Sequence, residues 1–221
     1  MQHINISIYT FEELQKEAKQ KALDALRDIN VDNSHWYDFV LSDFTAICKT
    51  IGITTREKDI YFQGFYSQGN GSAFDATIDL SVFLAAIREQ KWKEYAPDEK
   101  FCFADNPINN RVLALIKNGL ITSTISTSHT NRYYHLNYYS DHNFFPTISY
   151  NTPNIDRQLD LLDEWIRDIL HQLNRYLYKS LQEEYEYLCG DAIVQESIEA
   201  NEYLFTKDGK CANQLVHYAN H

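Results

Sequence analysis

The sequence predicts an α+β fold: a mostly antiparallel sheet, made of a central hairpin and a three-stranded meander, packed by helices that include one long C-terminal helix. Three observations lead to this prediction. Two alternating, aromatic-rich runs flank Gly69-Asn70-Gly71, and the hydrophobic period changes from helical to alternating after Gly119. Apolar residues then recur every three or four positions from Asn154 to Cys189, which is typical of an amphipathic helix.

A strand and two helices are expected near the N-terminus. Isoleucines alternate with polar residues over positions 4–8, which predicts a short strand. Thr10 and Glu13 have the spacing of a capping box, so we expect a first helix over residues 10–30. A second helix is expected over residues 33–52, ended by a glycine. Its predicted buried stripe is Trp36, Phe39, Val40, Phe44, Ile47 and Ile51.

The central hairpin is expected to turn tightly at Gly69-Asn70-Gly71, because glycine and asparagine tolerate the positive φ of such turns. In the strand that follows, apolar residues share one face and polar residues the other: Phe74, Ala76, Ile78 and Leu80 against Asp75, Thr77 and Asp79. Ser81 is then expected to cap a third helix that stops before Pro97.

A fourth helix and the meander are expected between residues 106 and 150. Asn106 as N-cap and Pro107 in the first turn predict a helix that ends before Gly119. The alternating pattern then predicts three antiparallel strands, over 120–128, 132–139 and 143–150, with turns near Thr130-Asn131 and Ser140-Asp141.

The C-terminal third is expected to be mostly helical. The apolar period predicts one long helix from Asn154 to Cys189. Asp191 is expected to cap a short helix to about Asn201, and Lys207-Asp208-Gly209 indicates a closing hairpin. Because no linker-like stretch interrupts the chain, we expect a single α+β domain over residues 1–221.

The composition excludes some classes of function. The formal net charge is −11, and residues 151–221 carry 13 acidic against 6 basic residues. A protein that binds duplex nucleic acid gains affinity from a basic stripe, and the sequence has none, so no such binding is expected. The acidic C-terminal third, with Glu183, Glu184 and Glu186 close together, is either a solvated helix face or a surface for a basic partner.

The cysteines and the hydropathy pattern indicate an intracellular protein. The four cysteines, Cys48, Cys102, Cys189 and Cys211, have neither metal-ligand spacing nor the density of a disulfide framework. No apolar run approaches the ~20 residues of a membrane span, and no leader peptide is recognisable. We therefore expect reduced thiols and a soluble, cytosolic protein.

The best candidate for a binding site is the aromatic cluster that follows residue 130. In an alternating strand half of these rings face away from the core, where they could stack on a base or anchor a protein partner; the alternative is core packing with a partly covered outer face. With two arginines and the central hairpin loop, the candidate residues are Gln68, Asn70, Arg111, Arg132, Tyr133, Tyr134, His135, Tyr138 and Tyr139.

No enzymatic signature is present, so no catalytic residue, metal or cofactor is expected. The glycines near residue 69 precede a strand, whereas a phosphate-binding loop needs a following helix. Asp75 and Asp79 share a strand face and could hold a divalent ion, but no third ligand lies near them in sequence. His129, His135 and His142 lack the spacing of a metal site, so hydrogen-bonded histidines are expected.

Three segments resemble small phage and prophage proteins that are labelled antitoxins of toxin–antitoxin stability systems. These are residues 9–22, Ile60–Phe74 and Asn201–Gly209, of which the central block is the most specific. Asn70 stands where the pattern of that group has an acidic residue. The resemblance implies a mobile-element protein that acts inside a bacterium, and it transfers no catalytic residue.

The resulting hypothesis is a non-enzymatic inhibitor, encoded by a phage or prophage, that sequesters a bacterial toxin or an anti-phage defence component. One alternative is a sponge that holds a nucleotide immune signal between aromatic rings, with Arg111 and Arg132 binding the phosphate. A second alternative is a metal-dependent nuclease or phosphodiesterase that uses Asp75 and Asp79. A homo-oligomer is compatible with each of these functions.

Overall fold

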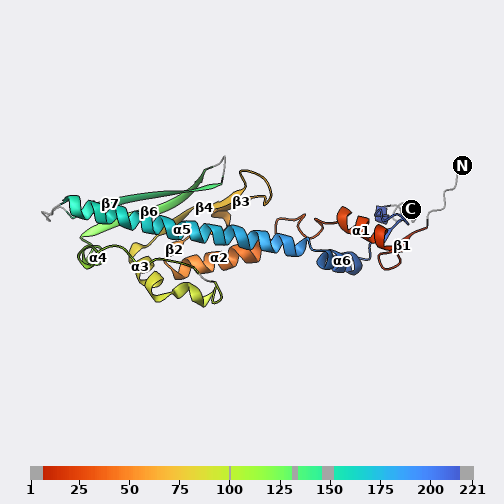
Figure 1. Ribbon diagram of the computed structural model, residues 1–221, viewed down its shortest axis with the longest axis horizontal. Helices are drawn as coiled ribbons and strands as arrows, with labels where there is room; N and C mark the ends of the chain where they lie inside the picture. Colours follow the sequence, from red (N-terminus) through yellow and green to blue (C-terminus); the bar gives the residue numbers. More distant parts are fainter. Residues whose placement is uncertain (1–6, 100, 131–133, 146–151, 215–221) are drawn as a thin grey trace. The chain divides into compact units, whose positions relative to one another are not determined.

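The computed structural model describes residues 7–99, 101–130, 134–145 and 152–214 (Figure 1). It confirms the α+β prediction: antiparallel strands are combined with helices, one of which, α5 (Thr152–Leu188), is 37 residues long. The contacts divide the chain into two compact units, the terminal unit (residues 1–37 and 183–221) and the central unit (residues 38–182). The single domain expected from the sequence stays a prediction.

The terminal unit joins both ends of the chain. It contains β1 (Tyr9–Thr10), α1 (Lys16–Ala25), α6 (Asp191–Ala200) and β8 (Leu204–Phe205), and β1 pairs antiparallel with β8. These elements bury a common apolar core: Phe11, Leu14, Ala18, Ala22, Leu23, Val194, Ile198 and Phe205. The closing hairpin is confirmed, with Phe205 bridged to Cys211 across a turn.

The predicted start of the first helix is wrong. The Thr10 amide donates to the Glu13 carboxylate over 2.8 Å, as in a capping box, but Thr10 lies in β1 opposite Leu204, and the residues after it form a turn. Because the strand holds Thr10, α1 begins only at Lys16. Of the strand predicted over residues 4–8, positions 4–6 lie outside the described residues, and the next two are not in a strand.

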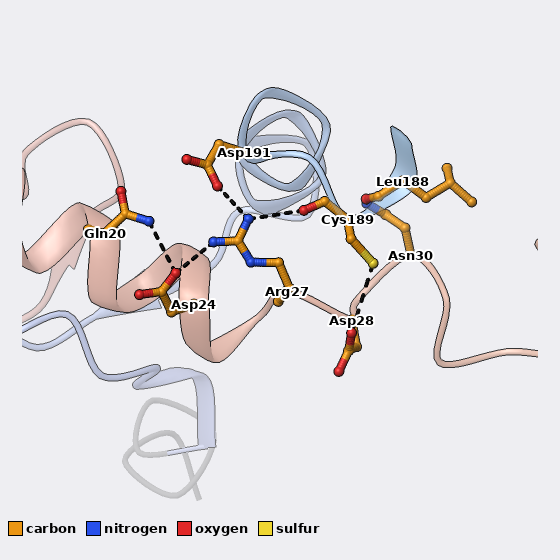
Figure 2. A network of polar contacts seen from close by, with 8 residues as sticks. All are labelled: Gln20, Asp24, Arg27, Asp28, Asn30, Leu188, Cys189 and Asp191. Atoms are coloured by element: carbon orange, nitrogen blue, oxygen red, sulfur yellow. Dashed lines mark hydrogen bonds and ion pairs between the residues drawn. The ribbon is translucent and has the colours of Figure 1, made fainter. Parts of the chain in front are cut away.

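Arg27 links α1 to the start of α6 within the terminal unit (Figure 2). Its guanidinium donates to the carboxylates of Asp24 and Asp191 and to the carbonyl of Cys189. Its hydrogen bonds to the two carboxylates raise the pKa of Arg27, against a smaller opposing effect of burial. The predicted cap Asp191 is therefore the first residue of α6 and pairs with Arg27, while Gly190 occupies the N-cap position.

The central unit contains a four-stranded antiparallel sheet in the order β2-β5-β6-β7. Its strands are β2 (Ile53–Thr54), β5 (Ala76–Ile78), β6 (Ile121–Thr130) and β7 (His135–Phe144). The predicted meander is wrong, because Ser140 and Asp141 pair with Ile125 and Thr124 inside one ten-residue strand instead of turning. The third predicted strand contributes only the end of β7 and Phe145, and its last residues lie outside the described part of the chain.

The central hairpin differs from the prediction in its turn and its extent. β3 (Ile60–Gln63) pairs with β4 (Gly71–Phe74), so the connection is a loop from Gly64 to Asn70, and Gly71 already belongs to the strand. The predicted second strand is split at Asp75 between β4 and β5, which lie in different sheets. The predicted burial of Phe74, Ala76, Ile78 and Leu80 is nevertheless confirmed.

The remaining helices begin later than predicted, except for α3. They are α2 (Asp38–Thr50), α3 (Leu80–Glu89) and α4 (Asn110–Lys117), with short 3-10 turns η1 (Glu57–Asp59) and η2 (Lys91–Glu94). Asp79, not Ser81, caps α3, and Asn109, not Asn106, caps α4. Phe39 is 84% exposed, because it lies on the opposite side of α2 from the buried stripe of Leu41, Phe44 and Ile47.

The helices of the central unit lie on one side of the four-stranded sheet (Figure 1). The inner face of the sheet contributes Ile53, Ile78 and Ile125, which lie in one cross-strand row, to the core. The long helix α5 supplies Leu162, Ile166 and Ile169, all at most 1% exposed. This one-sided arrangement determines which side chains of β6 and β7 face solvent.

Candidate functional site

The face of the four-stranded sheet that the helices leave uncovered is the leading candidate for a binding surface. We define the outer face by the residues that alternate with the buried row: Thr54, Thr77, Thr122, Thr124, Ser126, Ser128, Thr130, His135, Asn137, Tyr139, Asp141 and Asn143. The pairing places Thr77, Ser126 and Tyr139 side by side. Only Asp141 carries a charge, although 23% of all residues are charged.

Tyr139 is the large apolar side chain of the outer face, and it is 55% exposed. Its neighbours in the pairing are hydroxyl and amide side chains, which donate and accept hydrogen bonds at little desolvation cost compared with charged groups. β7 is also the last strand of its sheet, so one of its edges is unpaired by any described strand. The arrangement suits contact with a flat, largely uncharged protein surface.

The inward-facing side chains of β7 determine this orientation. Tyr138 and Ser140 donate to the two carboxylate oxygens of Asp163 on α5, over 2.7 and 2.6 Å, and the His142 ring lies 3.2 Å from Asp163. Ser123 on β6 completes the group through a 2.7 Å hydrogen bond to His142 Nδ1. These five residues form the Asp163 cluster, which attaches β7 to α5.

Burial and hydrogen bonding act in opposite directions on the pKa values of the Asp163 cluster. Burial raises the pKa of Asp163, but hydrogen bonds from His142, Ser140 and Tyr138 outweigh it and hold the pKa below its usual 3.8. Burial, followed by the hydrogen bond and charge of Asp163, raises the pKa of Tyr138. Asp163 is therefore an ionised acceptor and Tyr138 a stable donor at neutral pH.

The order Ser123–His142–Asp163 has the composition of a hydrolase triad but a different arrangement. In that triad the serine contacts Nε2 and the carboxylate contacts Nδ1, whereas here the two contacts are exchanged. Asp163 also accepts from Tyr138 and Ser140, and the His142 side chain is only 12% exposed. The described hydrogen bonds of the Asp163 cluster thus join the four-stranded sheet to α5.

Asp75 and Asp79 occupy separate structural positions. Asp75 accepts from the backbone and ring of His129, over 2.9 and 3.0 Å, and that ring stacks on Tyr61 at 3.6 Å between centroids. Asp79 accepts from the amides of Ser81 and Val82 as the cap of α3. Both carboxylates thus accept local hydrogen bonds, and the expected hydrogen bonding of His129 and His142 is confirmed.

The predicted aromatic cluster is divided by the alternation of β7. Tyr138 faces α5, whereas Tyr139 faces solvent. His135, the first residue of β7, is exposed, and Tyr134 precedes the strand with a positive φ of 47°. Arg132 and Tyr133 lie outside the described residues. Arg111 is an exposed residue of α4, and no described contact joins it to these tyrosines.

Asn70 has a structural role in the loop from Gly64 to Asn70. Its side-chain oxygen can accept from the amides of Phe65, Tyr66 and Ser67, the last over 2.8 Å. Gly64 has φ +49°, and a Cβ there would approach the Asn70 side chain to 2.6 Å. An acidic residue at position 70 would accept the same hydrogen bonds. Gln68, the other predicted loop residue, is exposed.

A comparison with family models matches residues 36–191 to the family described as Domain of unknown function (DUF8835). The match covers well over half of the chain. The protein belongs to this family. No curated protein and no solved structure matches the chain.

The DUF8835 region contains the whole central unit and ends at the first residue of α6. The outer face and the Asp163 cluster therefore both lie within the family region, whereas α1 and β8 lie outside it. Within the described residues, no helix combines the length and apolar character that a membrane crossing requires.

Sequence reasoning missed Asp163, Ser140 and His142 as a connected group. Asp163 interrupts an amphipathic helix face close to Leu162 and Ile166, and the alternate positions 138, 140 and 142 all carry hydrogen-bonding side chains. The recurrence of hydrogen-bonding side chains at every second position predicts one continuous strand with a polar contact on one face. The turn predicted at Ser140-Asp141 divided this strand in two, so the alternation was not recognised.

Proposed function

We propose that this protein is a non-enzymatic inhibitor that sequesters a bacterial toxin or anti-phage defence protein on the outer face of its four-stranded sheet. The exposed Tyr139, in a sheet face with a single charge, is the observation that carries the proposal. Tyrosine is enriched, and charge depleted, in the centres of protein interfaces. The resemblance to phage and prophage antitoxin-like proteins favours a mobile-element origin and a target inside the bacterial cytosol.

The rigid attachment of β7 to α5 supports this proposal. The three contacts of β7 with Asp163 hold the strand in one orientation, so Tyr139 is presented without a change in the backbone. Preorganisation of this kind reduces the entropy lost on binding. The nuclease alternative receives no such support, because Asp79 serves as a helix cap.

The test starts with affinity capture from a bacterial lysate, followed by purification of the captured protein. Its dissociation constant is then measured by calorimetry with the wild-type chain and with Tyr139→Ala. Loss of an interface tyrosine at such a position typically costs more than ~2 kcal/mol, so we expect binding to weaken by about thirtyfold. The captured protein is also expected to lose its own activity when the wild-type chain is added in equal amount.

Tyr95→Ala is the matched control, because Tyr95 is 53% exposed but does not belong to the outer face. It is expected to bind as the wild-type chain does. Equal binding by Tyr139→Ala and the wild-type chain would exclude the outer face as the contact surface. Turnover of a substrate by the purified chain alone would contradict the non-enzymatic proposal.

A further inference from the structure

A cavity of about 620 Å³ lies in the central unit, away from the residues of the outer face and the Asp163 cluster. Its walls come from α3, the turn that follows α3, the segment from Phe103 to Ile108, α4, and Trp165 of α5. Cavities of 300 to 1,000 Å³ typically hold small molecules. All of these residues lie within the family region.

Aromatic side chains form one part of the cavity wall. Trp92, Phe103 and Trp165 all line it, and the rings of Trp92 and Phe103 meet edge to face at 4.8 Å. Trp165 Nε1 donates to the carbonyl of Ala104 over 2.7 Å, which fixes the segment beside Phe103 against α5. The cavity therefore has a preformed aromatic wall of the kind on which a planar ring packs.

Positive charge predominates at the same cavity although the whole chain is acidic. Arg88 and Lys117 line it from the last turns of α3 and α4, and Asp105 is the single acidic residue of the lining. The Arg88 side chain is 82% exposed and has one ion pair, a distant 3.9 Å contact with Glu89. Lys117 has no ion-pair partner among the described residues. Two cations are thus available to an anion.

Trp92 adds a hydrogen-bond donor that has no acceptor. Its side chain is 4% exposed, and its Nε1–H is buried without a partner among the described residues. A buried donor of this kind costs free energy unless an acceptor reaches it, and such groups are uncommon away from sites with a specific role. This unmatched donor belongs to a residue of the cavity wall.

We infer that this cavity is a binding site for a small aromatic phosphate of the size of a nucleoside monophosphate. The ring packs against the wall formed by Trp92, Phe103 and Trp165, and Arg88 and Lys117 bind the phosphate from opposite helices. Guanidinium and ammonium groups are the usual protein partners of phosphate. This site does not involve the outer face. Ligand binding in the cavity is therefore tested separately from the proposed capture of a protein.

The test measures ligand binding by the full-length chain in a Trp36→Phe background, which leaves Trp92 and Trp165 as the fluorescent tryptophans. The probes are the four common nucleoside monophosphates, the corresponding nucleosides, and inorganic phosphate. At least one monophosphate is expected to change the fluorescence and raise the melting temperature in a concentration-dependent manner. The nucleosides and inorganic phosphate alone are expected to bind at least tenfold more weakly.

The variant Arg88→Ala/Lys117→Ala is expected to weaken monophosphate binding by about a hundredfold and nucleoside binding by less than threefold. Arg175→Ala/Lys93→Ala is the matched control, because it removes the same charges from exposed positions that do not line the cavity. The control is expected to bind as the parent does. Circular dichroism establishes that both variants are folded.

Two results would overturn the inference. The first is a complete absence of monophosphate binding up to millimolar concentration by the folded parent chain. The second is equal loss of binding in the cavity variant and the control variant, which would assign the effect to net charge. Either result leaves the capture experiment with Tyr139→Ala unaffected.

Discussion

Asp163 accepts hydrogen bonds from Tyr138 and Ser140, and it lies 3.2 Å from His142. One carboxylate on α5 thereby holds three alternate residues of β7. Because alternate residues of a strand share a face, the same contacts direct residues 137, 139, 141 and 143 toward the other side. A residue at the sheet–helix contact thus determines which side chains of β7 face away from α5.

Asp163→Asn should lower the free energy of unfolding by about 2 kcal/mol at neutral pH, because hydrogen bonds to a charged acceptor are lost. The folded-state pKa of Asp163 lies below its usual 3.8, so this contribution is complete above pH 3.8 and is lost as pH falls further, through the folded-state pKa. Urea unfolding of both proteins between pH 7 and pH 3 should show the difference shrinking at the acidic end.

Asp160→Asn is the control for this measurement, because Asp160 is an exposed residue of the same helix. It should leave the free energy of unfolding within about 0.5 kcal/mol of the wild-type value. A difference between Asp163→Asn and the wild-type chain that persists unchanged at pH 3 would contradict the assignment of an ionised acceptor.

At the scale of elements, β7 is one strand whose two faces have different surroundings. Its inner face is joined to α5, and its outer face belongs to the proposed binding surface. Tyr138 and Tyr139 are adjacent and chemically identical, so variants at the two positions compare the two faces directly. The Tyr138 ring also lies 5.2 Å from the Arg167 guanidinium, a contact that phenylalanine would keep.

Tyr138→Phe should destabilise the fold by about 1 to 2 kcal/mol, since it removes the donor to Asp163 and retains the ring. Tyr139→Phe should change stability by less than about 0.5 kcal/mol, because this hydroxyl lies on the exposed face. Chemical denaturation of the two variants provides the comparison. Equal losses in both would mean that β7 does not present alternate faces as described.

At the scale of the whole molecule, the chain forms two compact units, and α5 contributes residues to both. The terminal unit has its own core and its own polar network around Arg27, whose partners among the described residues all belong to the same unit (Figure 2). The family match covers the central unit and leaves most of the terminal unit outside. We therefore expect the two units to respond separately to local changes.

Arg27→Ala should accelerate hydrogen exchange about fivefold in the amides of α1 and α6 and leave β6 and β7 unchanged. This corresponds to a local loss of ~1 kcal/mol, the upper range for a partly exposed ion pair. Mass spectrometry of peptides from both units measures it. Lys21→Ala, an exposed position of α1, serves as control. Equal acceleration in β6 and α1 would show a single cooperative unit.

Features that depend on local periodicity and on backbone freedom could be predicted from the amino-acid sequence alone. The apolar spacing from Ile155 to Leu188 was sufficient to predict α5 within two residues at either end. Gly119 has φ +69° and Gly209 has φ +85°. Because glycine adopts such angles without strain, these two residues were sufficient to predict the end of α4 and the closing hairpin. These signals act between residues that are close in sequence.

Features that depend on partners far apart in the chain could be recognised only from the folded structure. Ser72 is held by Asn174, and Tyr138 by Asp163, so neither contact could be derived from local spacing. Asn109, not Asn106, caps α4, and its own amide donates to the side chain of Gln158 on α5. The outer face and the cavity arise in the same way: both are assembled from segments that meet only when the chain is folded.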